Sequence, residues 1–118
     1  MGHKILVIED QEQLALVLKE YLGDCGFSVQ IATTGREALN KVEQSKFGVL
    51  VTDFKLPDMD GLAVAEKARE RSPSLKIVFV TGYKMQLKKS KIQVGPDCQI
   101  IEKPCRPKKI LEAINKVT

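Results

Sequence analysis

The sequence is poor in aromatic residues and has no long apolar run. Tryptophan is absent, aromatic residues make up 5% of the chain, and there is a single histidine. No apolar stretch approaches the roughly 20 residues that a membrane-spanning helix needs. The N-terminal residues lack the long apolar segment and small-residue cleavage site of a secretory signal. One histidine gives little support for a zinc site or a Ser-His-Asp triad. We therefore expect a cytoplasmic protein without membrane contact.

Cysteine is also scarce. The three cysteines, Cys25, Cys98 and Cys105, are odd in number and match no zinc-binding spacing. A fold that depends on disulfides is not expected, which agrees with a reducing compartment. Cys25 and Cys98 are interpreted as small buried hydrophobic residues. Cys105 lies close in sequence to the site predicted below.

The remaining composition is that of a globular domain. Of the 118 residues, 43% are hydrophobic and 29% are charged, which excludes wholesale disorder. The length fits one domain spanning residues 1–118. A chain of this size buries roughly two-thirds of its unfolded surface, enough for a core without disulfides or a structural metal.

The charge is distributed unevenly. The formal net charge is +4 and the isoelectric point is near 9.0. Residues 1–83 carry 10 basic and 12 acidic side chains, whereas residues 84–118 carry 9 basic and 3 acidic ones. The net charges of −2 and +6 place the basic excess in the last third of the chain. A nucleic-acid-binding function is weakly supported, because this segment shows no clear recognition helix and no interleaved aromatic residues.

Strand and helix patterns alternate along the sequence. Short apolar or β-branched runs predict strands at residues 4–8, 27–32, 48–52, 75–80 and 98–102. Helical spacing of apolar residues predicts helices at residues 11–24, 34–42, 62–71, 84–94 and from 107 onward. Thr34-x-x-Glu37 resembles a capping box, and Pro107 suits the first turn of the last helix.

This alternation predicts an α/β fold. Short connections between five strand–helix units favour a doubly wound five-stranded parallel sheet in the order 2-1-3-4-5. Such a sheet binds ligands beyond the carboxyl ends of its strands, at the crevice between strands 1 and 3. Functional residues are therefore expected directly after those strands.

Acidic residues stand at both positions. Glu9 and Asp10 follow the first strand, and Asp53 follows the third. Two like charges 4 Å apart cost about 4 kcal/mol at an effective dielectric constant near 20, so protons or a cation must offset them. An all-oxygen cluster with few ligands suits Mg²⁺, which also binds phosphoryl oxygens. Thr81 and Lys103 end the fourth and fifth strands, and together these groups predict a phosphoryl-transfer site.

Simpler structural roles compete with this interpretation. An aspartate after a strand is most often a helix cap or a loop residue. Asp10 can cap the first helix as well as bind a metal, and Asp58 and Asp60 are interpreted as turn and cap residues outside the site. The site interpretation is favoured because four of the five predicted strands end in suitable residues.

These residues match a known family. The chain resembles a response regulator receiver domain, the phosphoacceptor part of bacterial two-component signalling, with a flavodoxin-like, CheY-like (βα)5 fold. The resemblance covers nearly the whole chain in the right order. Its motifs are Glu9-Asp10, Val-Leu-Val-Thr-Asp53, Leu-Pro-Asp-Met-Asp-Gly61, Thr81-Gly82 and Lys103-Pro104.

The resemblance implies a role for each acidic residue. Asp53 would take a phosphoryl group from the phosphohistidine of a sensor histidine kinase or phosphotransfer protein. Asp10 and Asp53 would ligate Mg²⁺, Glu9 would act through bound water, and the backbone carbonyl of Lys55 would complete the protein ligands. The protein would be a phosphoacceptor and not a turnover enzyme.

The resemblance also implies a switch. Thr81 and Lys103 would bind the oxygens of the acyl phosphate, and the Lys103-Pro104 bond is often cis in the family. Phosphorylation would draw Thr81 and Lys103 toward the new oxygens and remodel the face formed by helix 4, strand 5 and helix 5. Because this face is basic, a monomer or weak dimer is expected, with a downstream effector or output domain that offers an acidic surface.

Three positions modify this expectation. Ile100 occupies a site where many receivers carry an aromatic switch residue, and Tyr83 is a candidate substitute or an exposed loop residue. Lys55 and Tyr83 hold the positions that tune phosphate lifetime in the family, and their bulk predicts slow autodephosphorylation.

Other functions stay open at this point. A hydrolase or flavin protein can use the same fold, but the sequence has no glycine-rich phosphate loop. A receiver-like interaction module that acts without phosphorylation is the main alternative. The sequence does not name the kinase, signal or effector, or say whether a longer protein contains the domain.

Overall fold

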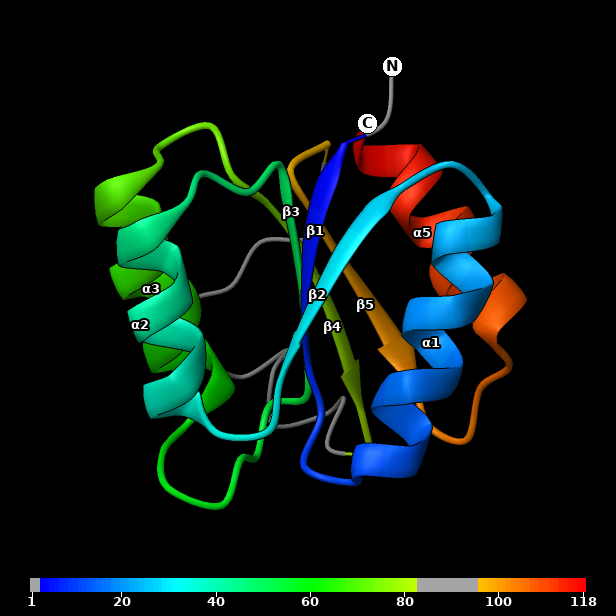
Figure 1. Cartoon of the computed structure of the whole chain (residues 1–118), viewed down its shortest axis with the longest axis horizontal. Coiled ribbons are helices and arrows are strands. Elements are labelled where there is room, and N and C mark those ends of the chain that lie inside the picture. The colour runs from blue at the N-terminus through cyan, green and yellow to red at the C-terminus, as the bar shows by residue number, and fades with distance from the viewer. Residues whose placement is uncertain (1–2, 83–95) are drawn as a thin grey trace.

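The alternating pattern folds into a parallel sheet covered by helices on both faces. The computed structural model describes residues 3–82 and 96–118 (Figure 1). Its elements are β1 (Lys4–Ile8), α1 (Glu12–Asp24), β2 (Ser28–Ala32), α2 (Gly35–Gln44), β3 (Val49–Thr52), α3 (Gly61–Arg71), β4 (Lys76–Thr81), β5 (Cys98–Glu102) and α5 (Pro107–Val117). The helix predicted at residues 84–94 lies outside the described residues.

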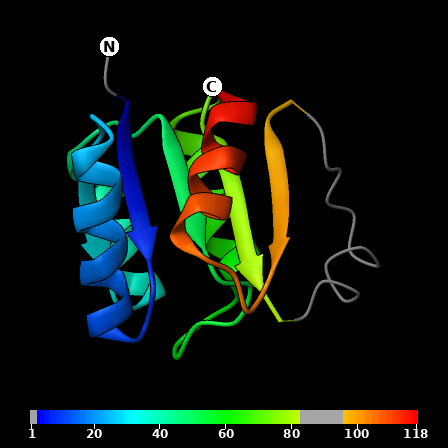
Figure 2. The same cartoon turned by 90° about the vertical axis from the view of Figure 1, so that its right-hand side faces the viewer.

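The sheet has the predicted topology. Its strand order is β2-β1-β3-β4-β5, and each neighbouring pair is parallel. All carboxyl ends therefore lie at one edge, the lower edge in Figure 2. Ile8 of β1 pairs with Thr52 of β3, so the residues that follow these two strands emerge next to each other.

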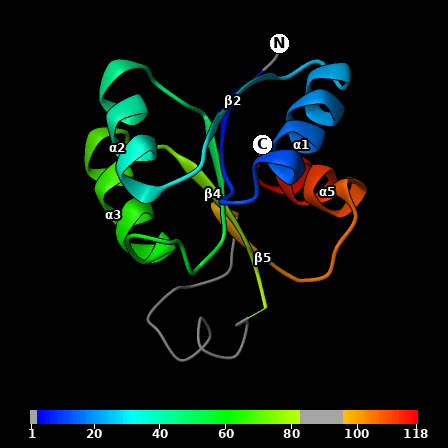
Figure 3. The same cartoon turned by 60° about the horizontal axis from the view of Figure 1, so that its bottom comes forward.

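Two apolar clusters, one on each face, hold the helices to the sheet. Successive strand side chains point to opposite faces, so Leu6 and Ile8 join the cluster beneath α2 and α3, whereas Ile5 and Val7 join the one beneath α1 and α5. Figure 3 shows the two helical layers on either side of the sheet. Burial on both faces explains why the central strands β1, β3 and β4 are apolar runs without polar alternation, whereas the edge strands β2 and β5 are only partly buried.

The predicted capping box of α2 is present with one difference. Thr34 Oγ1 accepts a hydrogen bond from the backbone N–H of Glu37 at 3.1 Å. The Glu37 carboxylate reaches one residue further back than expected, to the N–H of Thr33 at 2.7 Å. Two backbone donors at the start of the helix are thereby satisfied.

The buried face of α1 differs from the stripe that helical spacing of apolar residues predicts, which is Leu14, Val17, Leu18, Tyr21 and Leu22. The helix buries Ala15, Leu18 and Leu22 at helical spacing, while Leu14 and Val17 are 37% and 52% exposed. Apolar spacing alone did not distinguish which apolar residues of the helix face the sheet.

Burial was predicted for Cys98 and Cys25, and the structure confirms it for one of the two. Cys98 is buried, as predicted, in the core of β5. Cys25 is exposed, and its predicted burial was wrong. It is the C-cap of α1, next to Gly26, whose positive φ of 99° turns the chain from α1 toward β2. No helix among the described residues is long and apolar enough to cross a membrane.

Candidate functional site

The sheet brings the predicted groups to one edge. Glu9 follows β1, Asp53 follows β3, Thr81 ends β4 and Lys103 follows β5. Parallel pairing places the ends of neighbouring strands side by side, as in the pairs Ile8–Thr52 and Thr81–Glu102. The backbone N–H of Lys103 donates a hydrogen bond to the Thr81 carbonyl at 3.0 Å. Residues far apart in sequence therefore share one site.

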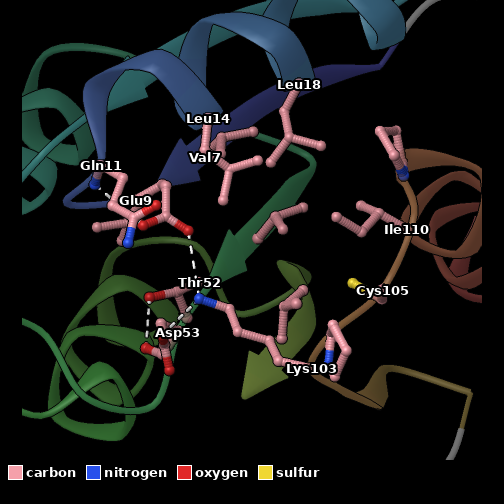
Figure 4. A pocket seen from close by; sticks show the side chains of 15 residues that line it. Val7, Glu9, Gln11, Leu14, Leu18, Thr52, Asp53, Lys103, Cys105 and Ile110 are labelled. Atoms are coloured by element: carbon pink, nitrogen blue, oxygen red, sulfur yellow. Dashed lines mark hydrogen bonds and ion pairs between the residues drawn. The ribbon is translucent and has the colours of Figure 1, made fainter. Parts of the chain in front are cut away.

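Lys103 joins the two strands that carry carboxylates. Its ammonium Nζ lies 2.9 Å from Asp53 Oδ2 and 3.4 Å from Glu9 Oε1 (Figure 4). Burial opposes the charged form of Lys103. The hydrogen bond to Asp53 and the charges of both carboxylates outweigh this opposition and raise its pKa above the usual value. The ammonium offsets part of the repulsion predicted between the carboxylates.

Glu9 is the enclosed member of the group. Its side chain is 6% exposed, against 16% for that of Asp53. Burial raises the pKa of the Glu9 carboxyl, and the neighbouring Asp10 carboxyl adds to this effect. Hydrogen bonding from the Gln11 N–H, at 3.1 Å from Oε2, and the charge of Lys103 act in the opposite direction. Glu9 is therefore held in place from two sides.

Asp10 occupies a different environment. Its side chain is exposed, and the N-cap position of α1 belongs to Gln11, so the proposed capping role of Asp10 was wrong. Among the residues that the structure describes, no three His, Cys, Asp or Glu side chains form a group that could hold a metal ion. The donors are nonetheless carboxylate oxygens, the chemistry that Mg²⁺ prefers. The Lys103 ammonium supplies positive charge between two of them.

The backbone around Asp53 is fixed by local hydrogen bonds. Thr52 Oγ1 donates to the Asp53 carbonyl at 2.9 Å, and the Lys55 N–H donates to Asp53 Oδ1 at 3.3 Å. The N–H of Gly61 donates to the Phe54 carbonyl, which folds the loop back onto the end of β3. Asp53 thus lies at the start of the loop between β3 and α3, and the two ends of this loop are joined by a hydrogen bond.

The other predicted positions have varied environments. Thr81 is fully buried and Lys55 is exposed. Ile100 is half-buried and packs against the α2/α3 cluster. The Lys103-Pro104 peptide bond is cis, as the resemblance implied. Tyr83 lies outside the described residues, so its proposed switch and tuning roles stay predictions.

One contact near the site was not expected from sequence. Asp58 lies in the loop after Asp53 and accepts hydrogen bonds from two N–H groups at the start of α2, those of Gly35 at 2.8 Å and Arg36 at 3.0 Å. Asp58 therefore caps a helix that precedes it by more than 20 residues. Asp60 is the N-cap residue of α3 but makes no side-chain cap hydrogen bond.

Replacing Asp58 with alanine should lower the urea midpoint of unfolding at pH 7. The hydrogen bonds from Arg36 and Gly35 lower the pKa of Asp58 from 3.8. The stabilisation is present above the unfolded-state pKa and is lost as the pH falls through the lower folded-state pKa. The difference between wild type and Asp58→Ala should therefore shrink at pH 3. Asp60→Ala is the matched control, and an equal loss in both variants would contradict the capping role.

Comparisons with known proteins agree with this arrangement. The model of the response regulator receiver domain matches residues 5–115. The response regulator receiver protein CpdR of Brucella abortus is 29% identical over 114 residues, covering 97% of this chain and 95% of CpdR. Two transcriptional regulators with similar sequences are longer, and this chain spans about half of each.

Solved structures show the same similarity. A CheY-like receiver domain protein from Methanospirillum hungatei has a TM-score of 0.84 and 31% identity, with 98% of this chain and 93% of that chain covered. A response regulator from Burkholderia pseudomallei, crystallised with a phosphorylated aspartic acid, a calcium ion and citrate, has a TM-score of 0.79 and 27% identity. The aligned region covers 95% of this chain and 66% of the Burkholderia chain. The chain belongs to the response regulator receiver domain family of two-component systems.

Proposed function

We propose that residues 1–118 form one phosphoacceptor receiver domain in which Asp53 accepts the phosphoryl group. The observation that carries this proposal is the 2.9 Å contact between Lys103 Nζ and Asp53 Oδ2, at a carboxylate that stays partly open to solvent. A positioned cation beside an accessible carboxylate is the arrangement that phosphoryl transfer requires.

Accessibility favours Asp53 over the neighbouring acids. A nucleophile needs one oxygen that an incoming phosphorus can reach. Glu9 is nearly enclosed and is engaged by Gln11 and Lys103. Asp10 is exposed, and the ion pairs that Lys103 makes among the described residues are with Glu9 and Asp53. Asp53 combines partial exposure with an adjacent ammonium.

The proposed reaction moves a phosphoryl group between two side chains. An Asp53 oxygen forms a bond to phosphorus while the bond from phosphorus to the donor histidine nitrogen breaks, leaving an acyl phosphate. Lys103 faces the negative charge of the phosphoryl oxygens. Thr81 is proposed to donate its hydroxyl to one of those oxygens. The donor is a sensor histidine kinase or a phosphotransfer protein.

The carboxylates are proposed to bind Mg²⁺. Asp10 and Asp53 would hold the ion, with Glu9 acting through water and Lys55 through its carbonyl. Bound Mg²⁺ would neutralise charge on the carboxylates and on the phosphoryl group. The phosphorylated aspartic acid and calcium ion in the Burkholderia relative support a site of this kind.

The proposed switch involves the ends of β4 and β5. Thr81 and Lys103 are already joined through the backbone at 3.0 Å, so movement of either toward a phosphoryl group is transmitted to the other strand. Ile100 on β5 is half-buried and would repack without an aromatic ring. Lys55 is proposed to crowd attacking water and lengthen the life of the acyl phosphate.

The output face is proposed to bind an acidic effector. The described part of this face includes the basic residues Arg106, Lys109 and Lys116 on or beside α5. Like charges would oppose close pairing of two copies, although screening limits the effect to about 10 Å at 0.1 M salt. Sedimentation with Mg²⁺ and a phosphate mimic should show a monomer or weak dimer, and a tight dimer through α5 would contradict this proposal.

Labelling with acetyl phosphate tests the proposed function directly. With Mg²⁺, intact mass should increase by one phosphoryl group, and peptide mapping should place it on Asp53. EDTA should reduce labelling to background, because the carboxylates would lose their metal. Absence of labelling at saturating acetyl phosphate and Mg²⁺ would instead favour an interaction module that acts without phosphorylation.

A further inference from the structure

A cavity extends from the proposed acceptor site, and its apolar part has no role in the proposed reaction. It measures about 390 Å³ and lies between α1, the carboxyl ends of β1 and β3, and the segment from Lys103 to Ile110. This is within the range of small-molecule sites, which are mostly apolar with a few placed polar groups. The aliphatic lining residues include Val7, Leu14, Leu18, Val51, Val80 and Ile110.

The cavity has two chemically different ends. Figure 4 shows Leu14, Leu18, Val7 and Ile110 around the apolar end, and the acidic site at the other. Glu9 and Asp53 both line the acidic end together with Lys103. Two carboxylates and one ammonium leave this end with an excess of negative charge.

The exposed position of Leu14 keeps the cavity accessible. Leu14 is 37% exposed on α1, although it lines the cavity, so its side chain lies at the boundary with solvent. Leu18, one turn further along, is 4% exposed and forms the inner wall. An apolar molecule entering past Leu14 would therefore cover surface that water contacts in the free protein.

We propose that this cavity binds a small amphipathic amine, with its apolar body between α1 and α5 and its ammonium at Glu9 and Asp53. The apolar walls select the body, and the excess carboxylate selects the positive charge. The charge also excludes an amphipathic carboxylate, which would face Glu9 and Asp53 with only Lys103 to offset the repulsion.

Such a ligand would regulate the acceptor site, and this part of the inference rests on the proposed function. The amine would occupy the same carboxylates that are proposed to hold Mg²⁺. It would therefore slow phosphoryl uptake by Asp53 without contacting Arg106, Lys109 or Lys116, the basic residues proposed to face the effector.

Alkylation of the cysteines measures whether the cavity is occupied, and this measurement does not depend on phosphorylation. Cys105 lines the cavity and is half-buried, whereas Cys25 is exposed at the far end of α1. Octylamine should slow alkylation of Cys105 by iodoacetamide and leave alkylation of Cys25 unchanged, as measured by peptide mass spectrometry without Mg²⁺ or a phosphodonor. In the series from butylamine to octylamine, each methylene that is buried should tighten binding by roughly fourfold.

Matched probes and variants test the two halves of the ligand. Octanol should protect Cys105 less than octylamine does, and octanoate least. Leu14→Gln should weaken protection by octylamine because it places an amide on the cavity wall. Leu16→Gln is the control, since Leu16 is 49% exposed on the same helix and does not line the cavity.

Each contrary result has a defined meaning. Equal protection of Cys25 and Cys105, or insensitivity to Leu14→Gln, would overturn the site. Octanoate protecting as well as octylamine would overturn the amine assignment. If Cys105 is protected but acetyl phosphate never labels Asp53, the proposed function fails and the binding site stands. If Asp53 is labelled and Cys105 is not protected, only this inference fails.

Discussion

Asp53→Asn is expected to reduce phosphoryl labelling by acetyl phosphate and Mg²⁺ to background. The amide has nearly the same shape as the carboxylate but lacks the charged oxygen that would bond to phosphorus. Intact mass should show the increase of one phosphoryl group in wild type and none in the variant. The same comparison with a phosphorylated histidine donor would test the proposed partner class.

The control for this loss is a second change from acid to amide. Asp24→Asn alters the last residue of α1, at the other end of the molecule from the acceptor site. It should label as wild type does. Asp53→Asn should remain folded, because the amide keeps the shape of the carboxylate and its oxygen can still accept the hydrogen bond from Lys103 Nζ. Full labelling of Asp53→Asn at another aspartate would show that the acceptor was assigned to the wrong residue.

Gly61→Ala is expected to lower both stability and labelling. A Cβ at position 61 would lie 1.9 Å from the carbonyl oxygen of Asp53, a backbone atom that cannot rotate away. Relief requires the loop between residues 53 and 61 to shift. Overpacking of this kind costs roughly 1–3 kcal/mol. A displacement near 1 Å at a reacting group can slow a reaction by about 100-fold.

Gly23→Ala separates this clash from the general effect of adding a methyl group. Gly23 lies in α1, and a Cβ there meets no atom within 4 Å. The variant should be more stable than wild type by about 0.5–1 kcal/mol, since alanine favours helix over glycine. Urea unfolding and acetyl phosphate labelling should be measured for both variants. Gly61→Ala with wild-type stability and labelling would show that the loop accommodates the methyl group.

Much of the fold could be predicted because local and global signals agree. The central strands β1, β3 and β4 are buried on both faces, so their apolar runs stand out from the helical spacing of the intervening segments. The doubly wound order then places the ends of the first and third strands together. For that reason the proximity of Glu9 and Asp53 follows from the topology alone.

The contacts that could not be predicted depend on loop paths and helix orientation. Asp58 caps α2 from a loop more than 20 residues later, and an aspartate in a turn carries no signal for so distant a partner. The exposure of Leu14 and Cys25 depends on the rotation of α1 and on the turn at Gly26. The cavity beside Asp53 could not be predicted for the same reason, since the spacing of Leu14 is that of an ordinary core residue.

The position of Lys103 has a consequence for the energetics of switching. In the resting protein the ammonium is already partly desolvated and held between Glu9 and Asp53. A phosphoryl group arriving on Asp53 would meet a cation that had already lost part of its hydration and been ordered when the chain folded. The reorganisation energy of phosphorylation is then mainly the energy needed to move the Lys103 side chain over a short distance. A receiver built in this way is preorganised for the charge it is proposed to accept.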